Sequence, residues 1–201
     1  MMKNLEICYC FILKRNVNKI MKTLKNYISE SILDDIDTQI KKGDKLIKDE
    51  IKSFIKENYL GAAIKISKNP NADGKYEVSS TKHVCKKQGI DLTSLTNGMF
   101  IWTTIDGNFR VSVCNSLTSL EGAPKEVGGD FECIGCKALT SLEGAPKKVG
   151  GDFYCAICLS LTSLEGAPKE VGGYFDCRGC KTKFTEEDVK KVSNVKGKII
   201  C

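Results

Sequence analysis

A 22-residue repeat occupies much of the second half of this 201-residue chain. Three clean copies follow one another: LTSLEGAPKEVGGDFECIGCKA (117–138), LTSLEGAPKKVGGDFYCAICLS (139–160) and LTSLEGAPKEVGGYFDCRGCKT (161–182). A diverged copy precedes them, in which Gly107, Phe109 and Cys114 stand where the later copies have Gly, Phe and Cys. The unit is short for a helix-turn-helix and carries Gly and Pro, so it predicts one strand and one return arc per turn of a solenoid.

The apolar positions of one copy predict which side chains face the interior. The candidates are Phe131, Cys133, Cys136, Leu139 and Leu142. The first two are two residues apart, as on one face of a strand, and the later ones are three apart, where the chain curls. Gly128-Gly129 supplies the tight turn before the strand. One copy cannot enclose its own apolar face, so we expect the copies to stack about 4.8 Å apart along a strand ladder.

At these residues the chain resembles the leucine-rich repeat family. Residues 131–140 are similar to the cysteine-containing pattern L-x-L-x-x-C-x-x-L-T, and the resemblance covers about residues 82–183. The repeats and the segment MKTLKNYISES are also similar to repeat proteins of bacteriophages. Gly128 stands where the family has a leucine, and we expect Val127 to fill that space. The resemblance implies an α+β repeat protein, a leucine-rich-repeat-like β-solenoid of about four short turns.

The first part of the chain predicts helices followed by a linker. Residues 1–20 are a candidate upstream extension, ahead of a second methionine at position 21. Over residues 21–65, Leu or Ile recurs every four residues from Leu24 to Ile40 and again from Ile47 to Ile55. Because Lys42-Gly43-Asp44 interrupts the pattern, we expect two amphipathic helices or one bent helix that covers an end of the solenoid. Residues 66–81 are expected to form a linker and a first strand.

The last segment, residues 184–201, predicts a cap for the other end of the repeats. Thr185 is a candidate helix N-cap with Asp188 three residues later. In the expected helix over 184–192, Glu186 and Glu187 lie in the first turn and Lys190-Lys191 lie late, which matches the helix dipole. The sequence GKII (197–200) predicts a final strand.

Charge and hydropathy argue against nucleic acid and membrane as partners. The net charge is +6, yet only three of the 31 basic residues are Arg, the residue that nucleic-acid readers favour for bidentate contacts. The apolar run ICYCFIL (7–13) is too short to span a bilayer and lacks a cleavage site for a signal peptide. We therefore expect a cytoplasmic protein with reduced thiols, in the host cell if the protein is encoded by a phage.

The repeated C-x-x-C pairs permit three interpretations, which are core residues of a stacked repeat, ligands of zinc or an iron–sulfur cluster, and disulfides. Their spacing lies within the range known for zinc sites, and the candidate ligands are Cys133, Cys136, Cys155, Cys158, Cys177 and Cys180. Every residue type of the copy recurs at the same step, however, and Val111 occupies the first of these positions in the diverged copy. Valine cannot bind metal but fills the same apolar slot, which favours cysteine as a small buried hydrophobe and no cofactor.

Differences between the copies indicate where a partner would bind. Eight variable positions in or beside the expected strands, here called the recognition strip, are Arg110, Ser112, Glu132, Ile134, Tyr154, Ala156, Asp176 and Arg178. In leucine-rich repeat proteins such positions lie on the concave sheet and contact partners, so the resemblance implies a protein–protein interaction scaffold. Drift on a tolerant surface explains the same differences.

Catalysis finds little support in the sequence. His83 is the one histidine and lies two residues from Cys85, so a Cys–His pair is conceivable. No third orienting group can be identified, and the repeated EVGGD lacks the Lys-Ser/Thr of a nucleotide loop. The expected function is non-catalytic binding of another protein, and the alternative is a zinc-binding module.

Overall fold

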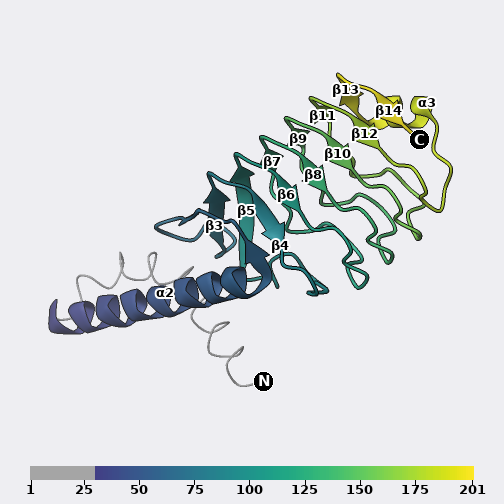
Figure 1. The fold of residues 1–201 in the computed structure, drawn as a ribbon. Helices are drawn as coiled ribbons and strands as arrows, with labels where there is room; N and C mark the ends of the chain where they lie inside the picture. Colours follow the sequence, from purple (N-terminus) through teal and green to yellow (C-terminus); the bar gives the residue numbers. More distant parts are fainter. Residues whose placement is uncertain (1–29) are drawn as a thin grey trace.

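The computed structural model describes residues 30–201 and forms a β-solenoid with a long helix at one end (Figure 1). Three features expected from the sequence lie outside the described residues. They are the candidate extension at 1–20, the apolar run at 7–13, and the start of the helical stripe at Leu24 and Ile28. No helix among residues 30–201 has the length and apolar character needed to cross a bilayer.

Two sheets run the length of the solenoid, and each turn contributes one strand to each sheet. Sheet A consists of β1 (Tyr59–Leu60), β4 (Val84–Lys86), β6 (Phe109–Arg110), β8 (Phe131–Glu132), β10 (Phe153–Tyr154), β12 (Phe175–Asp176) and β14 (Ile199–Ile200). Sheet B consists of β2 (Ile64–Ile66), β3 (Tyr76–Ser80), β5 (Phe100–Ile105), β7 (Glu126–Val127), β9 (Lys148–Val149), β11 (Glu170–Val171) and β13 (Asn194–Val195). Strand β1 pairs antiparallel with β4, and β2 pairs antiparallel with β3. The later neighbours in both sheets pair in parallel.

The prediction of about four turns and one strand per turn was wrong. The strand pairs from β3–β4 to β13–β14 make six turns. The first and last turns lack the repeat motif but keep buried or half-buried apolar residues in register with the repeat phenylalanines, where Val84 pairs with Phe109 and Ile199 pairs with Phe175. The second strand was missed because the expected arc holds a two-residue strand at Glu126–Val127, whose valine is buried as expected.

The interior side chains follow the predicted spacing. Phe131, Cys133, Cys136, Leu139 and Leu142 are all fully buried. The phenylalanines of successive turns form a ladder, with ring centroids 5.8 Å apart for Phe109–Phe131, 5.4 Å for Phe131–Phe153 and 5.0 Å for Phe153–Phe175. Because each ring contacts the ring above and below it, the core is continuous along the solenoid.

Side chains at the corner before sheet A join one turn to the next. The backbone N–H of Asp152 donates to Asp130 Oδ1 at 2.9 Å, and the N–H of Tyr174 donates to Asp152 Oδ1 at 2.7 Å. The same carboxylate position therefore accepts a backbone hydrogen bond from the following turn, which fixes the register of the stack.

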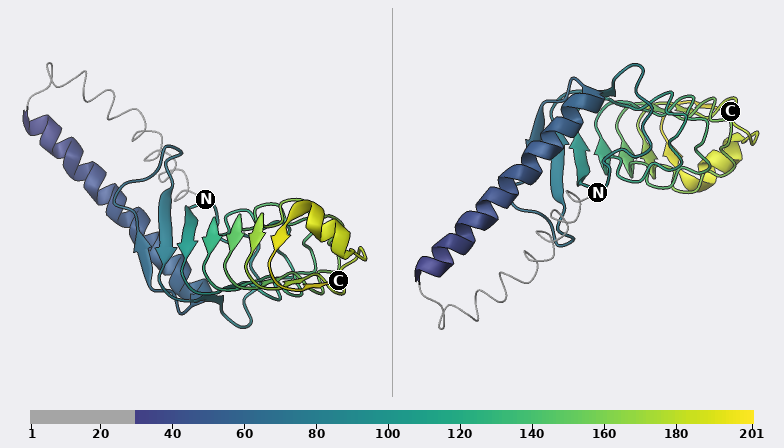
Figure 2. Two further views of the ribbon diagram at one scale, coloured as in Figure 1. Left: turned by 90° about the horizontal axis from the view of Figure 1, so that it is seen from above. Right: turned by 90° about the horizontal axis from the view of Figure 1, so that it is seen from below.

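The N-terminal end is covered by α2 (Glu30–Asn58), a single helix. It passes through Lys42-Gly43-Asp44 without a break, so the expected interruption is absent. Ile51 and Ile55 are buried, and Ile47 and Phe54 pack on the core. Figure 2 shows the helix running outward from the solenoid, and most described side chains between positions 34 and 42 are exposed. Only the last half of α2 therefore acts as a cap.

The C-terminal cap has the predicted form. Helix α3 (Glu186–Val192) begins at the N-cap Thr185, whose hydroxyl accepts from the N–H of Asp188 while the Asp188 carboxylate accepts from the N–H of Thr185. Strands β13 and β14 then continue sheets B and A. The cap is therefore a sixth turn in which a helix replaces the arc.

Candidate functional site

The recognition strip follows the outer face of sheet A. The strand register aligns Arg110 with Glu132, Glu132 with Tyr154 and Tyr154 with Asp176. The flanking positions in the same row are Cys85 and Ile200, which the sequence analysis did not include. Consecutive strand residues alternate between the two faces, so burial of the neighbouring Phe and Cys side chains turns this row outward.

Short polar contacts hold most of this row in place. Arg110 Nε lies 2.8 Å from Glu132 Oε1 on the next turn. The Tyr154 hydroxyl donates to Asp152 Oδ2 at 2.7 Å, and this bond raises the pKa of Tyr154 to about 12. Burial raises the pKa of Glu132, while Arg110 opposes the shift. The strip is thus ordered by contacts within the protein.

Two of the predicted strip residues offer almost no surface. Asp176 is 4% exposed and Ala156 is 7% exposed, so the expectation that they face solvent was wrong. Arg178 covers Asp176, donating from Nε at 3.0 Å and from a terminal nitrogen at 2.7 Å. Burial raises the Asp176 pKa, and the opposing bonds to Arg178 outweigh it and leave the pKa below its usual value. Ser112 and Ile134 are half-buried.

A ridge beside the strip carries two strained apolar residues. It consists of Val113, Gly135, Ile157 and Gly179, one from each of four successive turns. All four have positive φ, 58° for Val113 and 59° for Ile157 against 70° and 67° for the glycines. The two β-branched side chains are 59% and 53% exposed. A β-branched residue in this region is a real outlier, because its Cβ crowds the backbone.

The backbone ladder explains why this conformation persists without glycine. The N–H of Val113 donates to the carbonyl of Ile134 at 2.7 Å, and the N–H of Ile157 donates to the carbonyl of Arg178 at 2.7 Å. Two of the three clean copies have glycine at this repeat position, Gly135 and Gly179. Comparing the copies could therefore have identified Ile157 as the residue that departs from glycine. Leu159, two residues later, is also 52% exposed and was missed.

A pocket of about 600 Å³ opens at the first turns of the strip. Its lining includes Cys85, Arg110, Ser112, Val113 and Glu132. The Ser112 hydroxyl is buried and has no hydrogen-bond partner among the described residues. The pocket therefore joins three predicted strip residues to the first residue of the ridge.

The possible Cys–His pair is not assembled as a catalytic dyad. His83 Nδ1 accepts a hydrogen bond from the backbone N–H of Asn108 at 2.8 Å, which uses the imidazole to connect two turns. Burial raises the pKa of the Cys85 thiol, with Arg110 opposing and Glu132 reinforcing that shift. A raised pKa lowers the thiolate fraction that nucleophilic chemistry requires.

The interior cysteines interact across turns. Cys114 neighbours Cys136, Cys133 neighbours Cys158, and Cys155 neighbours Cys180, while the Cys177 thiol donates to the Cys201 Sγ at 3.5 Å. The Sγ atoms of Cys136, Cys158 and Cys180 also donate to backbone carbonyls of the preceding turn, at 3.4, 3.2 and 3.2 Å. The C-x-x-C spacing therefore reflects two columns of the stack.

These contacts bear on the alternative of a zinc site. Among residues 30–201, no three or more His, Cys, Asp or Glu side chains come together as metal ligands would. The hydrogen bond with Cys158 and burial hold the pKa of Cys133 well above its usual value, and burial does the same for Cys155. The neighbouring thiols Cys133 and Cys155 instead lower the pKa of Cys158 and Cys180, so the six candidate cysteines do not share one protonation preference.

A strong zinc chelator is expected to leave the melting temperature of the folded protein unchanged. A structural zinc site contributes about 10–16 kcal/mol, which matches or exceeds the net stability of about 5–15 kcal/mol for a whole domain. Thermal unfolding with and without chelator, together with a colorimetric assay of released zinc, checks this expectation. A large drop with stoichiometric zinc release would establish the zinc-binding alternative.

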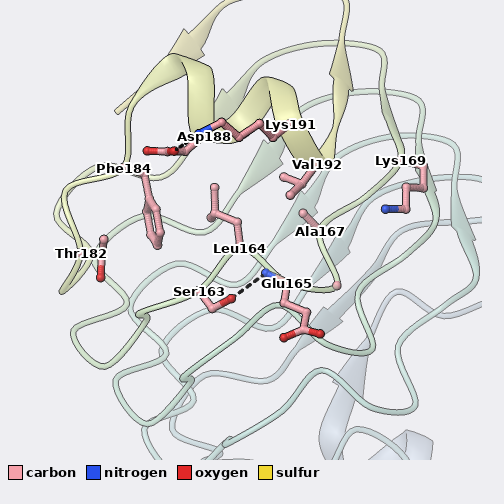
Figure 3. Close-up of a pocket in the computed structure, with 11 residues that line it drawn as sticks. Ser163, Leu164, Glu165, Ala167, Lys169, Thr182, Phe184, Asp188, Lys191 and Val192 are labelled. Atoms are coloured by element: carbon pink, nitrogen blue, oxygen red, sulfur yellow. Dashed lines mark hydrogen bonds and ion pairs between the residues drawn. The ribbon is translucent and has the colours of Figure 1, made fainter.

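A second hollow, of about 550 Å³, lies where α3 replaces the arc (Figure 3). Leu164, Phe184 and Val192 lie beneath the helix in this view. The charged side chains at its rim already contact each other, with Lys191 Nζ 3.0 Å from Asp188 Oδ1. We therefore attribute the hollow to incomplete packing between α3 and the arc of the last clean copy, and not to a binding site.

No protein-family model, curated protein or solved structure matches this chain. The function therefore has to be inferred from the chemistry of the strip, the ridge and the pocket.

Proposed function

We propose that this protein is a non-catalytic, leucine-rich-repeat-like scaffold that binds another protein through the recognition strip and the ridge beside it. The observation that carries the proposal is the exposure of Val113 and Ile157 in a backbone conformation that glycine adopts in the alternate turns. The structure thus keeps two apolar side chains at the surface at a conformational cost.

The magnitudes favour a binding role for these side chains. A non-glycine residue in the left-handed region costs about 1–2 kcal/mol, and an exposed side chain returns little of that to folding. A partner that buries Ile157 would gain about 1.5–3 kcal/mol from its apolar surface. Strained residues of this kind gather at functional sites because the surrounding structure holds them in place.

The surroundings of the ridge indicate the chemistry of the partner. Val113 and Ile157 lie over the glycines of the following turns. A Cβ placed on Gly135 would lie 3.8 Å from Val113 Cγ2, and one on Gly179 would lie 3.6 Å from Ile157 Cγ1. The ion pairs of Arg110 and Arg178 flank them. An apolar centre with a polar rim is typical of protein interfaces, so we expect a partner with a shallow apolar hollow edged by charged groups.

The state of the cysteines supports a reducing compartment for this scaffold. The nine cysteines among the described residues are free thiols, although many of them lie next to one another in the stack. Exported proteins usually carry disulfides, so we propose that the protein acts in the cytoplasm.

Affinity capture from native lysate, comparing variants, tests the proposed function. The double variant Tyr154→Ala/Arg178→Lys alters the strip but keeps a positive charge beside the buried Asp176. Its matched control is Lys148→Ala/Glu170→Ala, which removes an exposed ion pair on sheet B. We expect the control to retain the partner and the strip variant to lose it. A strip variant that captures every protein the wild type captures would refute the proposal.

Replacing Ile157 with glycine is expected to stabilise the fold and weaken partner capture. Glycine relieves the strain, for a gain of about 1 kcal/mol, or about 2–4 °C in melting temperature. Ile157→Ala is the control, because alanine removes the apolar surface but keeps the strain. Thermal unfolding should separate the two variants, whereas capture should fall in both. A lower melting temperature for Ile157→Gly than for the wild type would contradict the strain argument.

A further inference from the structure

We propose that Cys177 and Cys201 form a dithiol modification site, which a small disulfide such as oxidised glutathione converts into a disulfide joining the last two turns. The site lies at the end of the recognition strip, because Cys177 stands between Asp176 and Arg178, but the inference does not depend on the proposed function. The two thiols would react covalently with low-molecular-weight disulfides.

The geometry of the last turn brings these two thiols together. Strands β12 and β14 pair in parallel, with Asp176 beside Ile200, so the next residues along each strand are also neighbours. The N–H of Cys177 donates to the carbonyl of Ile200 at 2.9 Å, and the two Sγ atoms are 3.5 Å apart. Neighbouring strands are about 4.8 Å apart, which lies inside the range of Cα separations that a disulfide spans.

Accessibility distinguishes this pair from the other thiol pairs of the interior. Cys201 is exposed, whereas Cys177 is 2% exposed and sits directly behind it. Cys114, Cys136, Cys133 and Cys158 are fully buried, so a reagent reaches those pairs only if turns separate. Cys180 also has a buried thiol, Cys155, beside it, but Cys180 itself is only half-buried and so is less open to a reagent than Cys201. Among residues 30–201, Cys201 is the one cysteine whose side chain is exposed, and Cys177 lies behind it as a resolving thiol.

The chemistry is thiol–disulfide exchange in two steps. The Cys201 thiolate attacks one sulfur of the small disulfide, forming a mixed disulfide and releasing one small thiolate that takes up a proton. Cys177 then loses its proton and attacks the Cys201 sulfur, which expels the second small thiol. The protein dithiol is oxidised by two electrons, and the small disulfide is reduced to two thiols.

The new bond would fasten the cap to the solenoid. The loop between the two cysteines contains α3, β13 and β14, which together form the sixth turn. Without the bond, this turn is held by its parallel pairing with β12 and β11 and by apolar packing of residues such as Val189 on the core. A cross-link that closes such a loop restricts its opening and unfolding.

The full chain with Cys8→Ser and Cys10→Ser, treated while folded with oxidised glutathione at mildly alkaline pH, tests the proposal. Tryptic digestion should give the peptide 170–178 joined to the peptide 199–201. Amide hydrogen exchange over residues 182–200 should slow by about tenfold after oxidation. Adding Cys180→Ser should leave the joined peptides unchanged, whereas Cys201→Ser should abolish them. Because Cys201 is exposed, that last variant is expected to fold normally.

Three outcomes would overturn the inference. Cys201 could remain as a glutathione adduct, which would show that Cys177 does not resolve it. Cys201 could instead join the peptide 179–181, which would assign the site to Cys180. Dimers linked through Cys201 would show that the reaction is intermolecular.

Discussion

Replacing Gly150 with alanine is expected to destabilise the protein by at least about 3 kcal/mol, as overpacking against an immobile neighbour does. A Cβ on Gly150 would overlap the carbonyl oxygen of Gly128 in the preceding turn. The backbone cannot move away without losing the hydrogen bond from the N–H of Gly150 to the carbonyl of Val127, at 2.8 Å. Urea unfolding monitored by circular dichroism measures the change.

Gly89→Ala provides the matched control for this substitution. Gly89 also turns the chain, with φ of 79°, but no atom of residues 30–201 outside its chain neighbours lies within 4 Å of the place where a Cβ would stand. Its replacement should cost only about 1 kcal/mol, from backbone conformation alone. Equal losses in the two variants would show that close stacking of turns does not require Gly150.

Truncating Phe153 to alanine is expected to cost about 3–5 kcal/mol. Phe153 is fully buried in the middle of the ladder, with ring centroids 5.4 Å from Phe131 and 5.0 Å from Phe175. The cavity lies between two turns whose backbones are already fixed by hydrogen bonds, so it cannot collapse. The same urea unfolding experiment measures this loss.

Phe153→Leu is the control that separates a cavity from loss of the aromatic contacts. Leucine fills most of the volume, so this variant should retain clearly more stability than alanine does. A loss below about 1 kcal/mol for Phe153→Ala would mean that the turns repack and that the ladder does not hold them together.

The features of the fold that could be predicted are those encoded by the repeat or by local hydrogen bonding. Burial of Phe131, Cys133, Cys136, Leu139 and Leu142 followed from a spacing that changes from two to three, and all five are buried. The capping box at Thr185 and Asp188 followed from local hydrogen-bonding chemistry and is also present. Both inferences use short-range physics that needs no knowledge of the distant chain.

The turn count and the straight helix could not be predicted because tertiary contacts override the local pattern. The first turn keeps Tyr76 and Val78 buried without any repeat motif, so periodicity alone does not reveal it. Gly43 lowers helix propensity by about 1 kcal/mol relative to alanine, which α2 tolerates while its later residues pack on the core.

The alignment of the recognition strip along the strands could be predicted from the repeat, but the exposure of each side chain could not. The register of sheet A aligns Arg110, Glu132 and Tyr154 as expected, yet Asp176 lies beneath Arg178. Whether a strand residue is covered depends on how its neighbour's side chain folds back, which sequence spacing does not encode. Comparison of the copies shows that Ile157 stands where the other clean copies have glycine. Only the structure shows that its backbone has a positive φ and is therefore strained.

The ladder of identical contacts between clean copies has a consequence for the evolution of this protein. Residues 117–138, 139–160 and 161–182 present nearly the same upper and lower surfaces to one another. Recombination that gains or deletes one such unit joins surfaces that already fit, and it leaves both terminal caps with unchanged neighbours. Length variants of this chain should therefore differ by multiples of 22 residues, each with a longer or shorter row of outward side chains.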